Sequence, residues 1–273
     1  MLKFTGTSNI KKFVEHYIEC NRSMFKGKIV IDIPAGKGET SRILKNIECD
    51  IRPYDLFPEF YEYDKVTCMK ADLANKLPIE DSSADIIICQ EGIEHVPNQL
   101  FVLQEFNRIL KKEGILILTT PNISHLRAKL SYLFTESELF KRMPPNELDS
   151  LWYEDNVRRY FGHIFLLGIQ KLRVLAAIAG FRIRNINSVK ISVTSALLSF
   201  LYPISILVNA YAYVINMVQK GSLDHESKKS VYLDIIKLNL NPTIQFGRHL
   251  FLVLEKTDIP LGVHRPRRKI TDN

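Results

Sequence analysis

The chain has 273 residues, of which 46% are hydrophobic and 25% charged, and its formal net charge is +7. This composition supports a full hydrophobic core in a single domain with insertions, spanning residues 1–273. The four cysteines are scattered and form no C-x-x-C pair or zinc-type cluster with histidine, so we expect reduced thiols, no metal site and a cytoplasmic location. Despite the positive charge, no recognised nucleic-acid motif is present, so we expect no nucleic-acid partner.

The first predicted elements are an amphipathic helix over residues 8–25 and then a strand, a tight loop and a second helix. The strand is rich in isoleucine and ends in Asp32, and helical apolar spacing resumes directly after the loop. This is the start of a βαβ unit, whose ligands bind at the carboxyl ends of the strands. The loop lacks the dinucleotide and P-loop fingerprints. We therefore expect another cofactor here, bound at Asp32, Pro34, Ala35, Gly36 and Gly38.

The next two predicted strands also end in carboxylates. A strand over residues 49–55 ends in Asp55 and is followed by Leu56, with Asp50 as a weaker candidate acid. A further run from residue 66 ends in Asp72 and Leu73. These residues are expected at the same sheet edge as the glycine loop.

The fourth predicted strand begins at Asp85 and leads into Gln90, Glu91 and the segment Ile93-Glu94-His95-Val96. A helix then carries Leu103, Phe106 and Leu110 on one face, and we expect it to end at Gly114 as a C-cap. A buried strand and the sequence Thr-Thr-Pro-Asn follow, ending at residue 122.

Across residues 29–122 these motifs resemble those of class I S-adenosylmethionine (SAM)-dependent methyltransferases, and the Glu-His segment resembles their ubiquinone-biosynthesis-type (methyltransferase type 11-like) branch. The resemblance implies an α/β fold: a Rossmann-like, doubly wound, seven-stranded sheet, mostly parallel with an antiparallel last strand. It also implies SAM as the cofactor. Pro34 stands where the family usually has its first glycine.

The resemblance further implies a role for each matching residue. Asp32 would help to place the methionine part of SAM and Asp55 the ribose hydroxyls. Asp72 would face the adenine amino group, with Leu73 against the ring. The pair Gln90 and Glu91 would contact the methionine amino group or the acceptor.

Methyl transfer to a hydroxyl benefits from a base whose pKa is near neutral, which favours histidine. The candidates are His95, His125 and His163, and His95 ranks first because it follows the fourth strand. Glu91 lies at the same strand end. The alternatives are that Glu94 and His95 only brace that loop, and that His163 packs the lid onto the body.

The second half of the chain contains two predicted insertions. A lid-like insertion, expected to be helical, covers residues 133–163. A helix ending at Gly180 and strands over 181–189 and 249–255 complete the sheet, so residues 190–246 form an apolar helical insertion between the last two strands. A basic tail covers residues 258–273.

The segment from Ile191 to Gln219 has no charged residue and is bracketed by Lys190 and Lys220. We expect two short helices meeting at Pro203. They could form a buried hairpin, a homodimer interface, a membrane span or an element in the membrane interface. We favour peripheral contact with a membrane or a lipid-bearing substrate, on the cytoplasmic face.

The sequence therefore predicts a SAM-dependent methyltransferase that acts on the oxygen of a glycan, a lipid-linked compound or another small molecule. One alternative is a nucleic-acid or protein methyltransferase, although no Asn/Asp-Pro-Pro-Tyr-type motif follows the fourth strand. Another is a non-catalytic membrane-associated protein on the same fold. The departure at Pro34 favours this last alternative, and the carboxylates Asp32, Asp55 and Asp72 argue against it.

Overall fold

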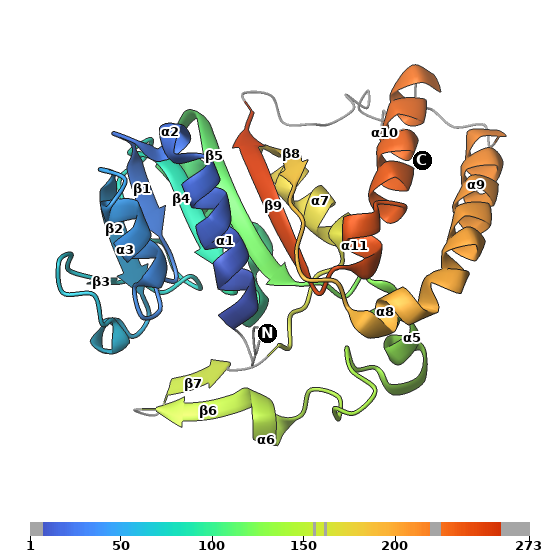
Figure 1. Ribbon diagram of the computed structural model, residues 1–273, viewed down its shortest axis with the longest axis horizontal. Helices are drawn as coiled ribbons and strands as arrows, with labels where there is room; N and C mark the ends of the chain where they lie inside the picture. Colours follow the sequence, from blue (N-terminus) through green and yellow to red (C-terminus); the bar gives the residue numbers. More distant parts are fainter. Residues whose placement is uncertain (1–7, 155–156, 161–162, 219–224, 258–273) are drawn as a thin grey trace, which may run out of the picture.

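The computed structural model describes residues 8–154, 157–160, 163–218 and 225–257, so the predicted basic tail and Lys220 lie outside the described residues. A seven-stranded sheet with the order β3-β2-β1-β4-β5-β9-β8 forms the centre of the molecule (Figure 1). Its strands are β1 (Ile29–Asp32), β2 (Asp50–Asp55), β3 (Met69–Lys70), β4 (Ala84–Gln90), β5 (Leu110–Pro121), β8 (Phe181–Ile186) and β9 (His249–Lys256).

Strands β1 to β5 are parallel, and β9 is inserted antiparallel between β5 and β8. The Rossmann-like, mostly parallel sheet predicted from the sequence is confirmed. The order reverses between β1 and β4, which places a ligand crevice at the carboxyl ends of these two strands.

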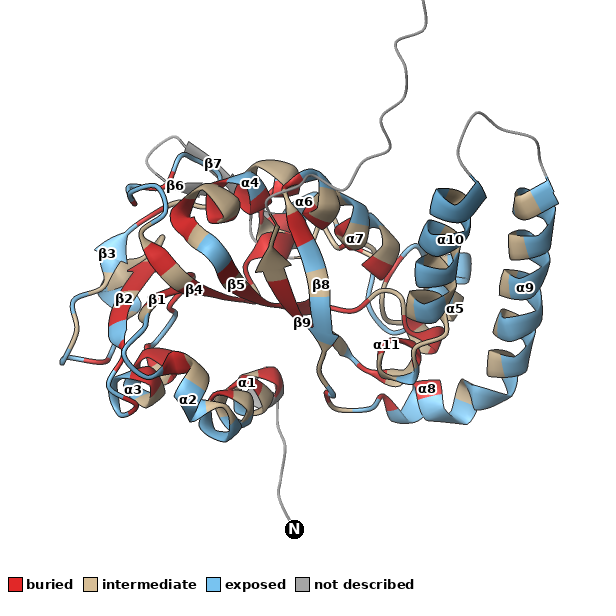
Figure 2. Ribbon diagram, turned by 90° about the horizontal axis from the view of Figure 1, so that it is seen from above, coloured by how far each residue is buried: buried red, intermediate tan, exposed pale blue. Residues whose placement is uncertain are grey.

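Helices cover both faces of the sheet (Figure 2). Successive residues of a strand point to opposite faces, so Ile86 and Ile88 of β4 pack in one core and Ile87 and Cys89 in the other. The first core lies under α1 (Ser8–Cys20), α2 (Arg22–Phe25) and α3 (Glu39–Lys45), and the second under α4 (Gln99–Ile109) and α7 (Ile169–Ile178).

The predicted N-terminal helix is present, with a break at Asn21 between α1 and α2. Residues Ile10, Val14 and Ile18 recur at four-residue spacing and are fully buried against the sheet. Helix α1 also approaches the cofactor loop, because Lys11 forms an ion pair of 2.7 Å with Glu39 at the start of α3.

The prediction that α4 ends at Gly114 is wrong. The helix ends at Ile109, and Leu110 already belongs to β5. The chain turns at Glu113, whose φ is +59°, and a Cβ on Gly114 would lie 2.8 Å from the carbonyl oxygen of Lys111. Glycine is therefore required by a tight turn at the start of the strand and not by a helix end.

The lid-like segment follows β5 and is only partly helical, which corrects the prediction of a helical lid. It starts within α5 (Leu126–Thr135), includes the short helix α6 (Glu147–Ser150), and continues as a two-stranded antiparallel sheet of β6 (Leu151–Glu154) and β7 (Val157–Tyr160). Short helical turns are present at η1 (Pro58–Phe60) and η2 (Ile93–His95) in the body of the molecule.

The chain between β8 and β9 forms a helical arm beside the body (Figure 1). It contains α8 (Val193–Leu197), η3 (Leu198–Leu201), α9 (Tyr202–Val218), α10 (His225–Asn239) and α11 (Pro242–Phe246). The break falls at η3, just before Pro203, but α9 continues for 17 residues and is not a short helix. The alternative of a buried hairpin is wrong, since no residue of α9 is buried.

Candidate active site

The β1 strand ends in a buried carboxylate. Asp32 is 1% exposed, and its Oδ2 accepts a 2.8 Å hydrogen bond from the hydroxyl of Ser41 in α3. Its Oδ1 is buried and has no partner among the described residues. Burial raises the pKa of Asp32 to about 7, although the Ser41 hydrogen bond opposes the shift. A cation placed at Oδ1 would supply the missing partner and keep the group ionised.

The loop after β1 has the backbone that its glycines predict. Gly36 has φ +53° and Gly38 has φ +85°, both in the left-handed region. The backbone N–H of Gly36 donates a 2.8 Å hydrogen bond to Oδ2 of Asp55, and the N–H of Phe57 donates to its Oδ1 at 2.9 Å. The carboxylate predicted for the ribose thus lies directly beside the glycine loop, whereas Asp50 lies at the opposite end of β2.

Loops from three strand ends meet around Gly92. A Cβ on Gly92 would lie 2.6 Å from Cδ of Pro34 and 3.3 Å from Cδ1 of Leu73. Asp72 is held beside them by accepting hydrogen bonds from the backbone of Ala74 and from the Asn75 side chain. The sequence therefore placed Pro34, Asp72 and Leu73 at the same crevice, as the structure does.

A second buried acceptor without a partner lies at the end of β4. The Nε2 of Gln90 donates a 2.7 Å hydrogen bond to Oγ1 of Thr40, and its Oε1 is buried without a partner among the described residues. β4 pairs directly with β1, so Oε1 of Gln90 and Oδ1 of Asp32 belong to neighbouring strand ends. An ammonium group, which donates three hydrogen bonds, fits this pair of acceptors.

Glu91 follows β4 in a left-handed conformation, with φ +50°. Its Oε1 accepts a 3.1 Å hydrogen bond from Thr119, and its Oε2 lies 3.5 Å from Nε2 of His249. Burial raises the pKa of Glu91 to about 7, so near neutral pH it can hold or release a proton. A residue of this type in a strained backbone position is common at functional sites.

Glu94 lies beneath the histidines and is fully buried. Its Oε2 accepts a 3.1 Å hydrogen bond from Thr120, and its Oε1 has no partner among the described residues. Burial and the neighbouring Glu91 raise the pKa of Glu94 to about 8. Its backbone carbonyl also accepts a hydrogen bond from the N–H of Phe165, which ties the end of the lid to the body.

His95 and His163 come together although 68 positions separate them. Their ring centroids are 5.6 Å apart, and both side chains are partly exposed. His163 Nδ1 lies 3.7 Å from Oε1 of Glu138 in the lid. The two candidate bases therefore lie side by side, one contributed by the loop after β4 and one by the lid.

The sequence predicted no metal site, yet one potential ligand atom each of Glu94, His95 and His163 lie within 4.8 Å of one another. Such a group has the spacing of a divalent-cation site. Sequence spacing could not show it, because the lid brings His163 in from a distant part of the chain.

His125, the third candidate base, has a structural role. Its Nδ1 accepts a hydrogen bond from the N–H of Ala128 and thereby caps α5, and it lies 2.8 Å from the hydroxyl of Ser195. Burial, together with the nearby Arg127, lowers the pKa of His125 to about 3. A buried histidine with its ring nitrogen occupied is not a general base for an external acceptor.

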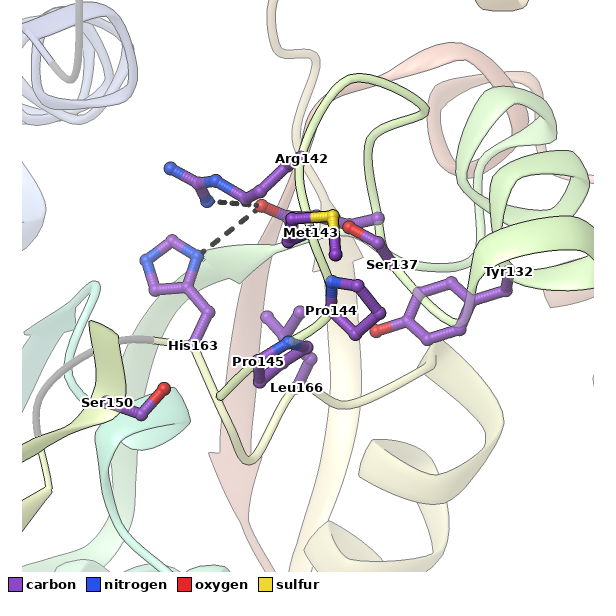
Figure 3. A pocket seen from close by; sticks show the side chains of 10 residues that line it. Tyr132, Ser137, Arg142, Met143, Pro144, Pro145, Ser150, His163 and Leu166 are labelled. Carbon is purple, nitrogen blue, oxygen red and sulfur yellow. Dashed lines mark hydrogen bonds and ion pairs between the residues drawn. The ribbon is translucent and has the colours of Figure 1, made fainter. Parts of the chain in front are cut away.

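A cavity of about 420 Å³ lies within the lid, and residues between Tyr132 and Leu166 line it (Figure 3). His163, Glu138 and Arg142 form its polar side, and Arg142 donates a 3.1 Å hydrogen bond to Glu138. Tyr132 and Met143 contribute to its apolar side. The cavity is large enough for a small molecule or one end of a larger one.

Several residues of the site were not predicted from the sequence: Thr40, Ser41, Thr119, Thr120, Glu138 and His249. Thr119 and Thr120 lie in the Thr-Thr-Pro-Asn sequence at the end of β5, and that sequence was the only signal for them. Asn122 of the same sequence is structural, because it donates hydrogen bonds to the carbonyls of Ile244 and Gly247. Nothing in the local sequence marks Glu138 or His249.

Solved structures share this fold. A SAM-dependent methyltransferase from Archaeoglobus fulgidus matches over 90% of this chain and 94% of its own, with a TM-score of 0.52 and 14% identity. A second structure, described as a putative S-adenosylmethionine-dependent methyltransferase from Listeria monocytogenes, matches over 89% of this chain and 97% of its own. Its TM-score is 0.50 and its identity is 10%. These likenesses show that the chain has the fold of class I SAM-dependent methyltransferases.

The sequence itself gives the family. The chain belongs to the methyltransferase domain family, whose model matches residues 10–186. A ubiquinone biosynthesis O-methyltransferase from Haemophilus ducreyi is 27% identical over 142 residues, which are 47% of this chain and 60% of that protein. A probable SAM-dependent methyltransferase of Mycobacterium tuberculosis is 38% identical over 60 residues, 22% of each chain. SAM is thus the cofactor.

Proposed function

We propose that this methyltransferase transfers the methyl group to an oxygen of a small-molecule acceptor, either a glycan or a lipid-linked compound. The observation that carries this proposal is the meeting of His95 and His163 at the end of β4, with the buried carboxyl groups of Glu91 and Glu94 beside them. A hydroxyl acceptor benefits from a positioned general base, a role that suits histidine, and the cavity beside His163 gives the acceptor a place to bind.

The donor half of the site holds the cofactor. When bound, SAM supplies an electrophilic methyl group on a sulfonium. Asp32 and Gln90 would accept hydrogen bonds from its ammonium group, which would give a partner to Oδ1 of Asp32 and Oε1 of Gln90. Asp55 would hold the ribose hydroxyls, and Asp72 would accept from the adenine amino group. The backbone of Ala35, Gly36 and Gly38, the ring of Pro34, and Leu56 and Leu73 line the rest of the binding site.

The acceptor half orients the hydroxyl and removes its proton. His95 is the proposed general base, because it lies at the end of β4 beside the expected methyl position. His163 approaches from the lid and would orient the acceptor, with Glu138 behind it. Glu91 is the remaining candidate for contact with the acceptor. Aligning the two reactants in this way can supply several kcal/mol of the barrier reduction.

The test of this proposal follows the methyl group into cell material. Methyl-labelled SAM is incubated with the protein and extracts separated into lipid, sugar and polymer pools. Label that enters the lipid or sugar pool as an alkali-stable ether supports the proposal. Label that enters nucleic acid or protein, or an amine product, would contradict it.

A further inference from the structure

Helix α9 is amphipathic, but its polarity is inverted relative to a helix on a water-soluble surface. Seven large apolar or aromatic residues share one side, between 42% and 76% exposed: Ile204, Leu207, Val208, Tyr211, Val214, Ile215 and Val218. We call this set the outer face of α9. Asn209 faces α10, because Asn239 of α10 donates a hydrogen bond to it, and Ser205 lies one helical turn before Asn209 on the same side. A helix in water places its apolar stripe inward.

Three polar side chains of α9 donate hydrogen bonds to backbone carbonyls one turn earlier in the chain. Ser205, Asn209 and Asn216 each donate a hydrogen bond to the backbone carbonyl four residues earlier, at 3.4, 2.8 and 2.8 Å. Such bonds satisfy the donors without water or a partner. The helix can therefore enter an apolar environment without leaving these donors unpaired, which would cost several kcal/mol per group.

A chain of side-chain amides fixes this orientation. Gln170 of α7 donates a 2.9 Å hydrogen bond to Asn239 of α10, and Asn239 donates a 2.7 Å hydrogen bond to Asn209 of α9. The polar side of α9 is thus bound to the body through α10. The outer face must point away from the protein.

We propose that the outer face of α9 docks in the interfacial region of an anionic lipid bilayer, and that the methyl acceptor is carried by that membrane. The region Val193–Val218 is the one stretch of the described residues that is long and apolar enough to cross a membrane. It contains no charged residue, whereas the three lysines of α10 outnumber its two acidic residues and the whole chain carries +7. This charge complements anionic lipid.

The pairing of the strands on either side of the arm implies that the arm docks on the membrane without crossing it. β8 precedes the arm and β9 follows it, and the two strands pair with each other, so both ends of the arm stay on one side of the membrane. A crossing by α9 would require α10 to return, but α10 contains five charged residues. At 17 residues, α9 alone is also about 26 Å long, which is shorter than the hydrocarbon core.

The arm is continuous with the acceptor side of the site. Helix α5 packs against α8 and η3, and its residues Leu133 and Phe134 are 72% and 71% exposed. The preceding residue, Tyr132, lines the lid cavity. An acceptor with an apolar tail could therefore remain in the bilayer while its head enters the cavity. This part of the inference rests on the proposed function, whereas docking itself does not.

Flotation with vesicles tests the docking. The full chain is mixed with phosphatidylcholine vesicles containing phosphatidylglycerol, and the bound fraction is measured at low and high salt. We expect the wild type to float with the vesicles. The double variant Leu207→Glu, Val214→Glu should have a vesicle–water partition coefficient at least about tenfold lower. The matched control, Val174→Glu with Ile178→Glu, changes two exposed apolar residues of α7 and should float like wild type.

Folding and cofactor binding are checked separately by circular dichroism and by calorimetry with SAM. If the double glutamate variant is unfolded, Leu207→Ser with Val214→Ser replaces it, with the same expected direction. A wild type that does not float, or equal flotation of all variants, would overturn the proposal. The proposal would also be overturned if the wild type formed a dimer, did not bind vesicles, and became a monomer on substitution of α9. The outer face of α9 would then bind a second copy of the chain. Failure of SAM binding would instead overturn the proposed function.

Discussion

Helices α1 and α9 each have an apolar face, but the two faces point in opposite directions relative to the body of the protein. Ile10, Val14 and Ile18 of α1 face the sheet and are at most 2% exposed, while Leu207 and Val214 of α9 are 69% and 56% exposed. The first helix closes a core beside the cofactor loop. The second helix turns its polar side to the protein and its apolar side outward.

The comparison shows that an apolar stripe alone does not predict which side of a helix is buried. The partners of the polar stripe must also be known. On α1 the polar side reaches solvent and charges such as Glu39. On α9 the polar side makes hydrogen bonds to itself and to Asn239. The two regions should therefore respond separately, with donor-side changes altering chemistry and arm changes altering vesicle binding.

The largest effect is expected at His95. His95→Ala should lower turnover by about 10² to 10⁴ because it removes the general base, while the Kd for SAM and vesicle binding stay at wild-type values. The measurement is single-turnover methyl transfer beside calorimetry. Turnover near that of wild type would leave His95 as a brace for the loop.

Chelation of metal ions from the wild-type protein distinguishes a general base from a metal ligand at His95. If His95 acts as a base, EDTA leaves wild-type turnover unchanged. Turnover that is lost in EDTA and restored by a divalent cation would instead make Glu94, His95 and His163 a catalytic metal site, given the proximity of their ligand atoms.

The next effect is on donor binding. Gly36→Val places a side chain in the open space of the loop, where the nearest atom to a Cβ is Nζ of Lys11 at 3.8 Å, so SAM binding should become unmeasurable. The matched control is Gly27→Val, which has the same backbone strain at φ +70° with no atom near its Cβ. Equal SAM affinity in both variants, each with native circular dichroism, would place the cofactor elsewhere.

A smaller loss is expected at Asp55. Asp55→Ala removes charge-assisted hydrogen bonds worth on the order of 1.5–3 kcal/mol each, and it frees the N–H of Gly36. SAM affinity should fall at least about tenfold in calorimetry, without a change in flotation. A change smaller than threefold would contradict the assignment to the ribose.

The smallest effect concerns stability at the junction of body and arm, where His125 contacts Ser195. The folded-state pKa of His125 is lowered to about 3, so the unfolded chain takes up a proton first as the pH falls below about 6.5. Stability is full above that pH, and this residue removes about 1.4 kcal/mol per pH unit below it.

His125→Asn keeps a side chain that can cap α5 but cannot titrate. Denaturant unfolding between pH 5 and 7 should therefore depend less on pH in the variant than in wild type. Equal slopes in the two proteins would show that His125 is not the titrating group.

The sheet predicted from the sequence is confirmed, and the residues predicted for the donor side lie at neighbouring strand ends, because short-range signals determine both positions. Apolar runs predict strands, and Asp32, Gly36, Asp55 and Asp72 follow those strands directly, where topology brings them together. The acceptor side could not be predicted in this way. His163 and Glu138 reach His95 only through the lid, and the lid hairpin has no motif.

The arm could be predicted only in part. Its apolar composition is visible in the sequence, but the direction of its apolar face depends on which side pairs with α10. That pairing rests on Asn209, Asn239 and Gln170, which are separated by up to 69 positions. The helix end expected at Gly114 failed for a related reason, since a tight turn and a helix cap both require glycine.

The most direct measurement compares methyl transfer from labelled SAM to membrane-extract lipids in two physical states. The lipids are supplied either as anionic vesicles or in detergent micelles. Each form is given to the wild type and to the double variant Leu207→Glu, Val214→Glu. We predict that the variant is at least about tenfold slower than wild type on vesicles and equal to it in micelles, because its active site is intact. Equal rates on vesicles, or an equal defect in both states, would contradict the account.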